Sequence, residues 1–284
     1  MSKPDHTMLK QRIITALLLM AVLLPALFYP SSEPFVLLSL LLMVAGGWEW
    51  ARLNACAPAV AKAVGLGLGL ALLAFWLLGG LEQTWRPVWL VSSLVWVGLA
   101  VVMLRRGVAG WSVWPAAIRL GLGLLLLACA WLALVQARQL GVGFLLSVLT
   151  LVWMADIAAY AGGRAFGRRK LAPTLSPGKS WEGVVSGLAG VLLLGLGWRW
   201  FDGQQLTDQP SLFTRLQTLG ELVSWLAVIG LTAMSVVGDL LESLVKRSAG
   251  MKDSSQLLPG HGGVLDRVDA LLPVLPLAMM LVTL

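Results

Sequence analysis

The feature that most limits how this chain can fold is the recurrence of long apolar runs. A helix needs about 20 mostly apolar residues to cross the hydrocarbon core of a bilayer. Only 12% of the 284 residues are charged, whereas a soluble domain has about 25%. We therefore expect an all-α integral membrane protein with about nine transmembrane helices, eight and ten being the alternatives. The expected spans are residues 13–29, 35–51, 63–80, 88–104, 120–137, 142–161, 184–200, 222–245 and 268–284.

The flanking residues predict how these spans are oriented. No small-x-small cleavage site precedes Pro30, so the first run is expected to be a span and not a cleavable signal. Basic residues in short loops stay on the cytoplasmic side. With the N-terminus inside, 17 basic residues fall in cytoplasmic segments and four fall outside, which together make the 21 of the chain. We expect a multi-pass protein of the cell membrane (the bacterial inner membrane), with a cytoplasmic N-terminus and an external C-terminus.

Two loops on the cytoplasmic face, residues 162–183 and 246–267, are more polar than a simple connection needs to be. Both lie in the second part of the chain. We therefore divide it into N-terminal transmembrane helices over residues 1–110 and a transmembrane catalytic region over residues 111–284.

The first polar loop carries groups that suit phosphate binding. Its glycines let a ligand approach the backbone, Ser176 and Ser180 can donate hydrogen bonds, and Lys179 supplies positive charge. The glycine spacing is not that of a Walker A loop. Composition alone leaves an alternative open, namely a basic cytoplasmic loop in which Ser180 caps the next helix.

The second polar loop follows a helix face that carries ionisable side chains at the membrane boundary. Asp239, Glu242, Ser243 and Lys246 are spaced i, i+3, i+4 and i+7, which places them on one face. Ionisable groups at this depth are costly to bury, so their presence predicts a functional site with the catalytic chemistry on the cytoplasmic side.

A second acidic pair, Asp266 and Asp269, lies at i and i+3 where the last span begins. Carboxylate oxygens with neighbouring cations suit Mg²⁺ that holds a polyphosphate. Zinc is not expected, because the chain has only two histidines, His6 and His261, and no thiols near them. His261 is either a structural hydrogen-bonding residue in a glycine-rich turn or a phosphate contact.

The stretch from Ser243 to Asp269 resembles the signature of the phosphatidate cytidylyltransferase (CDP-diglyceride synthase) family. The matching residues are Ser243, Lys246, Arg247, Lys252, Asp253, Ser255, Leu258, Pro259, His261, Gly262, Gly263, Val264, Asp266, Arg267, Val268 and Asp269. Upstream, the similar residues are Asp156, Tyr160, Gly163, Arg164, Gly167, Ser176, Pro177, Gly178, Lys179, Ser180, Glu182 and Gly183. The likeness covers the C-terminal half by motif and the N-terminal half by hydropathy and length.

This resemblance implies that CTP and phosphatidic acid react to give CDP-diacylglycerol and pyrophosphate, with Mg²⁺ as cofactor and a monovalent ion such as K⁺ as an optional second ion. The expected metal ligands are Asp239, Asp266 and Asp269, with Asp156 and Asp253 as further candidates. The expected catalytic residues and phosphate contacts are Asp239, Ser243, Lys246, Arg247, Lys252, His261 and Arg267, and the expected substrate contacts are Ser176, Lys179 and Ser180.

The expected partners are CTP, phosphatidic acid and membrane lipid, and a homodimer is an assembly that stays open. Nucleic acid is not expected, because the basic residues are divided among short loops. The main alternative function is a transporter of anions or lipid phosphates, although the polar clusters lie at span ends and no internal repeat is visible. The CDP-alcohol phosphatidyltransferases are less similar, because their Asp-Gly-x2-Ala-Arg hallmark is absent.

Overall fold

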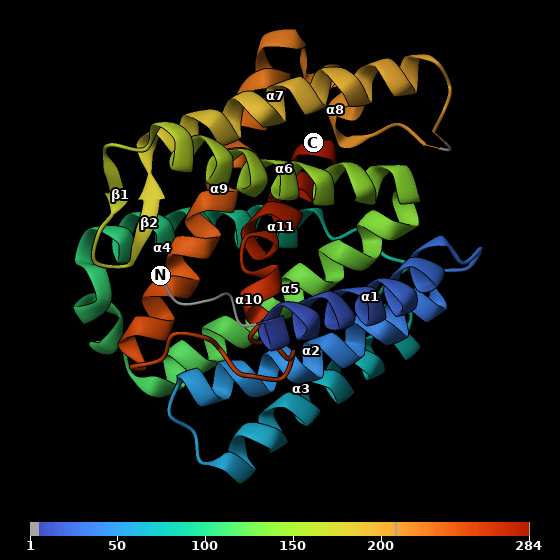
Figure 1. The fold of residues 1–284 in the computed structure, drawn as a ribbon. Helices are drawn as coiled ribbons and strands as arrows, with labels where there is room; N and C mark the ends of the chain where they lie inside the picture. Colours follow the sequence, from blue (N-terminus) through green and yellow to red (C-terminus); the bar gives the residue numbers. More distant parts are fainter. Residues whose placement is uncertain (1–5, 208, 284) are drawn as a thin grey trace.

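The computed structural model describes residues 6–207 and 209–283, without the side chains of residues 6–10 and 12. Within these residues the protein is a bundle of long helices with one short hairpin (Figure 1). The elements in chain order are α1 (His6–Phe28), α2 (Glu33–Leu53), α3 (Pro58–Leu77), α4 (Arg86–Ser112), α5 (Ala116–Leu140), α6 (Val142–Phe166), β1 (Lys170–Ala172), β2 (Ser176–Ser180), α7 (Trp181–Gly203), α8 (Leu212–Arg215), η1 (Leu216–Leu219), α9 (Glu221–Ser248), α10 (Leu265–Val268) and α11 (Leu271–Thr283).

Each predicted span coincides with a helix. Seven of the described helices, α2 to α7 and α9, are long and apolar enough to cross a membrane. The first and last predicted spans fall on shorter apolar stretches, Ile13–Phe28 and Leu271–Thr283, and Leu284 lies outside the described residues. The helical membrane-protein class is therefore confirmed, whereas the count of nine crossings and the sides on which the termini lie stay predictions.

The prediction of an all-α chain is wrong at one place. Residues 170–180 form an antiparallel two-stranded hairpin, in which Lys170 pairs with Ser180. A connection with Pro and Gly inside its second strand cannot extend a helix, and pairing of its two arms satisfies backbone groups instead. The fourth helix also runs beyond its predicted end, to Ser112, through a kink at Gly107, whose φ is +65°.

Close backbone packing holds neighbouring helices together. A Cβ at Gly162 of α6 would lie 1.9 Å from Ser186 Oγ of α7. A Cβ at Gly65 of α3 would lie 2.4 Å from the carbonyl oxygen of Val44 in α2. Lipid tails are as apolar as the side chains, so the hydrophobic effect does not drive one membrane helix against another. Small residues stabilise such pairs because they let the two backbones approach closely.

The polar segments meet at one end of the bundle. The hairpin lies beside α9 (Figure 1), and Lys179 of β2 forms an ion pair with Asp239 of α9. At the same end, Glu49 near the C-terminus of α2 binds backbone amides of Val264 and Leu265 at the start of α10. Segments far apart in the sequence therefore converge on one polar region.

Candidate active site

One face of α9 carries a row of ionisable side chains, as the spacing predicts. Ser243 Oγ donates a hydrogen bond to Asp239 Oδ1 over 3.3 Å. One turn away, Lys246 Nζ lies 2.5 Å from Glu242 Oε2, and Glu242 is buried. Because the rest of this face packs in an apolar interior, the charges on it need partners from other segments.

The hairpin supplies a partner for Asp239. Lys179 Nζ lies 2.6 Å from Asp239 Oδ2, and the two side chains are 24% and 30% exposed, respectively. The pair is thus reachable from outside the protein. A negatively charged ligand could replace the Asp239 carboxylate as the partner of Lys179, and a cation could replace Lys179 as the partner of Asp239.

Lys179 and Asp239 line a cavity of about 370 Å³ between α6, the hairpin, α7 and α9. This volume falls in the range of roughly 300–1,000 Å³ that is usual for small-molecule sites. The other polar residues of the lining are Asp156, Tyr160, Arg164, Ser176 and Ser180. All three predicted substrate contacts therefore surround one cavity, together with two of the predicted metal ligands.

The start of α7 fixes the shape of the hairpin. Glu182 accepts hydrogen bonds from the amides of Arg168 at 3.1 Å and Arg169 at 3.2 Å. Ser180 Oγ accepts from the amide of Gly183 over 3.1 Å, which is the helix cap that composition left open. Ser180 is therefore a capping residue that also borders the cavity.

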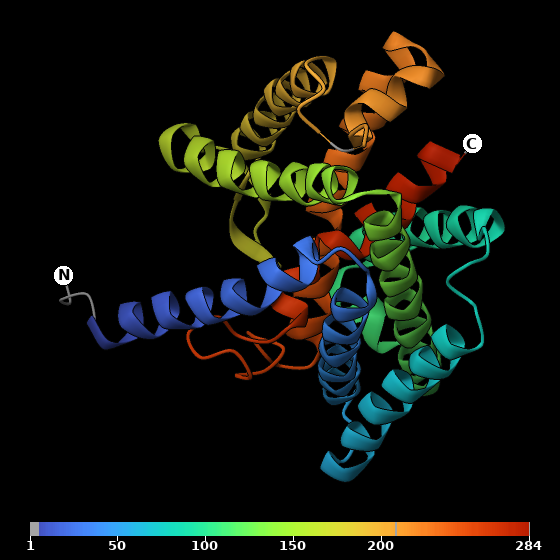
Figure 2. The same cartoon turned by 90° about the vertical axis from the view of Figure 1, so that its right-hand side faces the viewer.

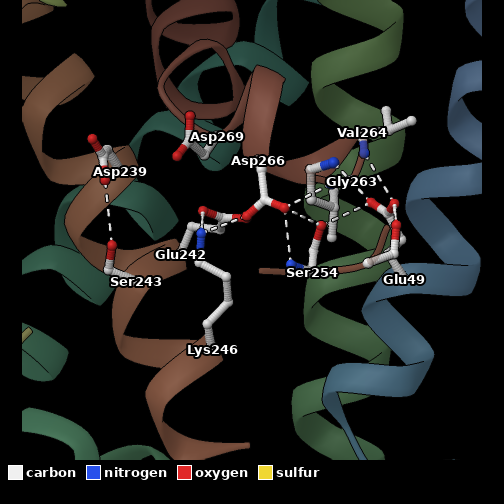
Figure 3. Close-up of polar contacts among 12 residues, drawn as sticks. Glu49, Asp239, Glu242, Ser243, Lys246, Ser254, Gly263, Val264, Asp266 and Asp269 are labelled. Atoms are coloured by element: carbon white, nitrogen blue, oxygen red, sulfur yellow. Dashed lines mark hydrogen bonds and ion pairs between the residues drawn. The ribbon is translucent and has the colours of Figure 1, made fainter. Parts of the chain in front are cut away.

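Lys246 connects α9 with α10 (Figure 3). Its Nζ lies 2.5 Å from Asp266 Oδ1. The other oxygen of Asp266 accepts from the amide of Gly263 at 2.8 Å and from the amide and hydroxyl of Ser254, each at 2.9 Å. Burial opposes ionisation of Asp266, but these hydrogen bonds outweigh it and hold the pKa of that carboxyl below its usual value.

A fully buried acid from the N-terminal helices, Glu49 of α2, holds the same loop. Its Oε1 accepts from Ser255 Oγ at 2.6 Å and from the amide of Val264 at 2.9 Å. Its Oε2 accepts from the amide of Leu265 at 2.8 Å and lies 3.2 Å from Ser254 Oγ, whose one proton is shared between Glu49 and the nearer Asp266. The loop is therefore held between two carboxylates, one from α2 and one from α10.

The predicted metal ligands only partly gather. Asp239 and Glu242 both lie close enough to Asp269 to interact with its carboxyl, and Figure 3 shows Asp239 and Asp269 on adjacent segments. In the described part of the chain, however, no three His, Cys, Asp or Glu side chains come together closely enough to hold a metal ion. An ion bound here would need further oxygen ligands, and Mg²⁺ commonly takes these from substrate phosphates and water.

The other predicted contacts lie around these clusters. Arg247 and Arg267 are exposed. Lys252 and Asp253 line an open hollow of about 700 Å³ beside the end of α2. The ring of His261 is half-buried, and its Nδ1 has no hydrogen-bond partner among the described residues. Asp253 thus lies with Lys252 in a separate hollow, not in the cavity that Asp239 lines.

Two acids of the site were not singled out from the sequence as site residues, Glu49 and Glu242. Glu242 was placed on the correct helix face but given no role. The sequence does contain a pattern that indicates Glu49, because this residue is an acid inside the apolar run of residues 35–51. An ionisable residue inside a span is by default a functional or paired group.

Known proteins resemble the chain, several of them over nearly its whole length. The sequence model of the cytidylyltransferase family matches residues 10–284. A phosphatidate cytidylyltransferase of Pseudomonas aeruginosa is 41% identical over 272 residues, which cover 95% of each chain. One from Haemophilus influenzae is 36% identical and covers 95% of this chain and 96% of its own. A third, from Thermotoga maritima, is 38% identical over 50% of this chain and 49% of its own.

Proposed function

The chain belongs to the cytidylyltransferase family, and we propose that it transfers the cytidylyl group of CTP to phosphatidic acid, giving CDP-diacylglycerol and pyrophosphate for phospholipid synthesis. The observation that carries this function is the cavity in which Lys179 of the hairpin meets Asp239 of α9. In this cavity, Lys179 can bind a phosphate group and Asp239 can bind a metal ion. Both lie at the end of a bundle whose helices are apolar enough to cross a membrane.

The chemistry needs little covalent help from the protein. A phosphate oxygen of phosphatidic acid attacks the α-phosphorus of CTP, the bond from that phosphorus to the bridging oxygen breaks, and pyrophosphate leaves with the electron pair. An alkyl phosphate has a second pKa of about 6, so the attacking group is mostly ionised near neutral pH and needs no strong base. Catalysis then consists of alignment and charge neutralisation.

We assign phosphate binding to the cations that border the cavity and to the neighbouring cation of α9. Lys179 and Arg164 line the cavity, and Lys246 lies on the same helix as Asp239. Lys246 is held by Glu242 and Asp266 on two sides, which fixes its ammonium group. A fixed cation stabilises developing negative charge without a reorganisation cost at the moment of reaction.

We assign Mg²⁺ to Asp239 and Asp269, with Asp156 as a third carboxylate on the cavity wall. Hard carboxylate oxygens suit this ion, and Mg²⁺ is usually held by one or two carboxylates and by substrate phosphates. When bound, the ion would neutralise charge on the triphosphate. Asp266 stays a candidate ligand, although Lys246, Ser254 and Gly263 already occupy its oxygens. K⁺ as a second ion stays a prediction.

An apolar groove suits the acyl chains of phosphatidic acid. A groove of about 670 Å³ is lined by α1, α2 and α6 and by residues of the loop before α10 and of α10 itself. The ribbons of these helices are seen in Figure 2. Leu18, Leu42 and Trp153 contribute to the apolar wall of the groove, and exposed Arg267 also lines it. Trp153 and Asp156 are one turn apart on α6, so a lipid in the groove would bring its phosphate toward the cavity of Lys179.

We place the site on the cytoplasmic side, where CTP is available, with the N-terminus inside. The basic loops that predict this orientation include the hairpin and the segment after α9, and both lie at the polar end of the bundle. The proposal includes nine crossings of the membrane by the chain. Assembly into a homodimer stays a prediction.

The experiment that tests the function is a turnover assay with purified protein in mixed micelles. CTP, phosphatidic acid and Mg²⁺ should give a CDP-lipid identified by mass spectrometry, whereas omission of phosphatidic acid should give none. The alternative function, a transporter of anions or lipid phosphates, predicts that sealed vesicles accumulate the substrate unchanged. A folded preparation that forms no CDP-lipid with any divalent ion would exclude the cytidylyltransferase proposal.

A further inference from the structure

Glu49 is the one described side chain that joins the N-terminal helices to the loop before α10 through contacts with four polar groups of that loop. The amides of Val264 and Leu265 and the hydroxyl of Ser255 donate to it, and the Ser254 hydroxyl shares its one proton between Glu49 and Asp266. The side chain is fully buried. A buried carboxylate without a paired cation is costly, and the three full hydrogen bonds together with the shared Ser254 proton provide the compensation it needs.

The loop fits around Glu49 with no room to spare. A Cβ at Gly263 would lie 2.3 Å from Glu49 Oε1 and 2.1 Å from Ser254 Oγ. The side chain of Leu265 also packs on α2, since its Cδ2 lies 3.4 Å from where a Cβ at Gly46 would be. The position of the loop relative to α2 is therefore fixed by polar and apolar contacts together.

The same loop sets the position of Asp266. Gly263 and Ser254, which contact Glu49 or lie against it, also donate to Asp266 Oδ2. Asp266 in turn receives Lys246 on its other oxygen. A continuous chain of contacts thus runs from Glu49 of α2 through the loop to Lys246 of α9, as Figure 3 shows.

We propose that Glu49 is a positioning residue for the cytidylyl-transfer reaction, which acts by holding residues 254–265 against α2 so that Asp266 keeps Lys246 where it stabilises the negative charge that develops during transfer. Glu49 itself touches no substrate in this scheme. The proposal rests on the proposed function for its kinetic readout and on the loop geometry for its structural readout. It also explains why an acid lies inside an apolar span.

The test compares Glu49→Gln with Glu49→Asp and with Glu33→Gln, an exposed acid at the start of the same helix. Gln keeps the size but turns an N–H group toward donors that need an acceptor. We expect kcat to fall by at least 10-fold in Glu49→Gln, with KM for CTP changed less than 3-fold and partial recovery in Glu49→Asp. Glu33→Gln should match the wild type.

A second readout separates positioning from folding. Hydrogen exchange of the amides of Val264 and Leu265 should accelerate at least 10-fold in Glu49→Gln, while the exchange of α5 and α6 stays unchanged. Should Glu49→Gln fail to fold, Ser255→Ala removes one donor only and should show a smaller change of the same kind. Unchanged kcat, or a loss matched by the loss of folded protein with uniform exchange, would overturn the proposal. If wild-type protein forms no CDP-lipid, the function fails while the exchange measurement still decides the role in holding the loop.

Discussion

Lys179 and Asp239 lie 60 positions apart in the sequence, and yet Lys179 Nζ and Asp239 Oδ2 are separated by only 2.6 Å. The contact closes the hairpin over the face of α9 that carries the other charged groups. It also predicts a competition, because a nucleotide phosphate needs Lys179 and a metal ion needs Asp239. If the nucleotide and the metal ion bind together, the Lys179–Asp239 ion pair is replaced by one contact from Lys179 to phosphate and one from Asp239 to the metal ion.

The first prediction concerns Lys179. Lys179→Met removes the charge and keeps much of the length, and we expect kcat/KM for CTP to fall by about 100-fold, which is typical for loss of one charge-stabilising contact. Lys170→Met is the matched control, since Lys170 lies on the other strand of the hairpin, is exposed and does not line the cavity. Equal losses in both variants would show that only the net charge of the hairpin matters.

The second prediction separates the roles of two acids by titration with Mg²⁺. Asp239→Asn should raise the Mg²⁺ concentration for half-maximal activity by at least 10-fold, because a metal ligand is lost. Asp266→Asn should abolish turnover without unfolding the protein, since it releases Lys246 and the loop. Undiminished turnover in Asp266→Asn would contradict its place in the site, and an unchanged Mg²⁺ requirement in Asp239→Asn would contradict the metal assignment.

Some features of the site follow from local sequence patterns, whereas others depend on residues far apart in the chain. The spacing of Asp239, Ser243 and Lys246 predicted one helix face, and apolar runs predicted the helices, because both depend on local periodicity. The hairpin was missed, since its strands are short and pair with each other only. Glu49 was missed as a site residue because its partners are more than 200 positions away, a distance that no local pattern encodes.

The third prediction tests the groove as an acyl-chain site. Leu42→Trp should narrow the groove and raise the KM for phosphatidic acid with long acyl chains at least 5-fold, with a smaller effect on a dioctanoyl substrate and none on CTP. Leu41→Trp is the matched control, because Leu41 is 67% exposed on the same helix and is not part of the groove wall. A similar change in both variants would mean that the groove does not select the chains.

The fourth prediction tests the orientation. Cys56 lies in the turn between α2 and α3, near the end of α2 that carries Glu49, and is partly exposed. In a Cys129→Ser background, a membrane-impermeant maleimide should label Cys56 in inside-out vesicles and not in right-side-out ones. Labelling from the outside alone would reverse the topology and place the polar end away from cytoplasmic CTP.

The measurement that tests the central claim most directly is the stoichiometry of turnover by purified protein. With CTP, phosphatidic acid and Mg²⁺, one pyrophosphate should appear for each CDP-lipid formed, and both should disappear when either substrate is omitted or Mg²⁺ is chelated. Pyrophosphate released without phosphatidic acid, or none released by folded protein under any divalent ion, would contradict the account.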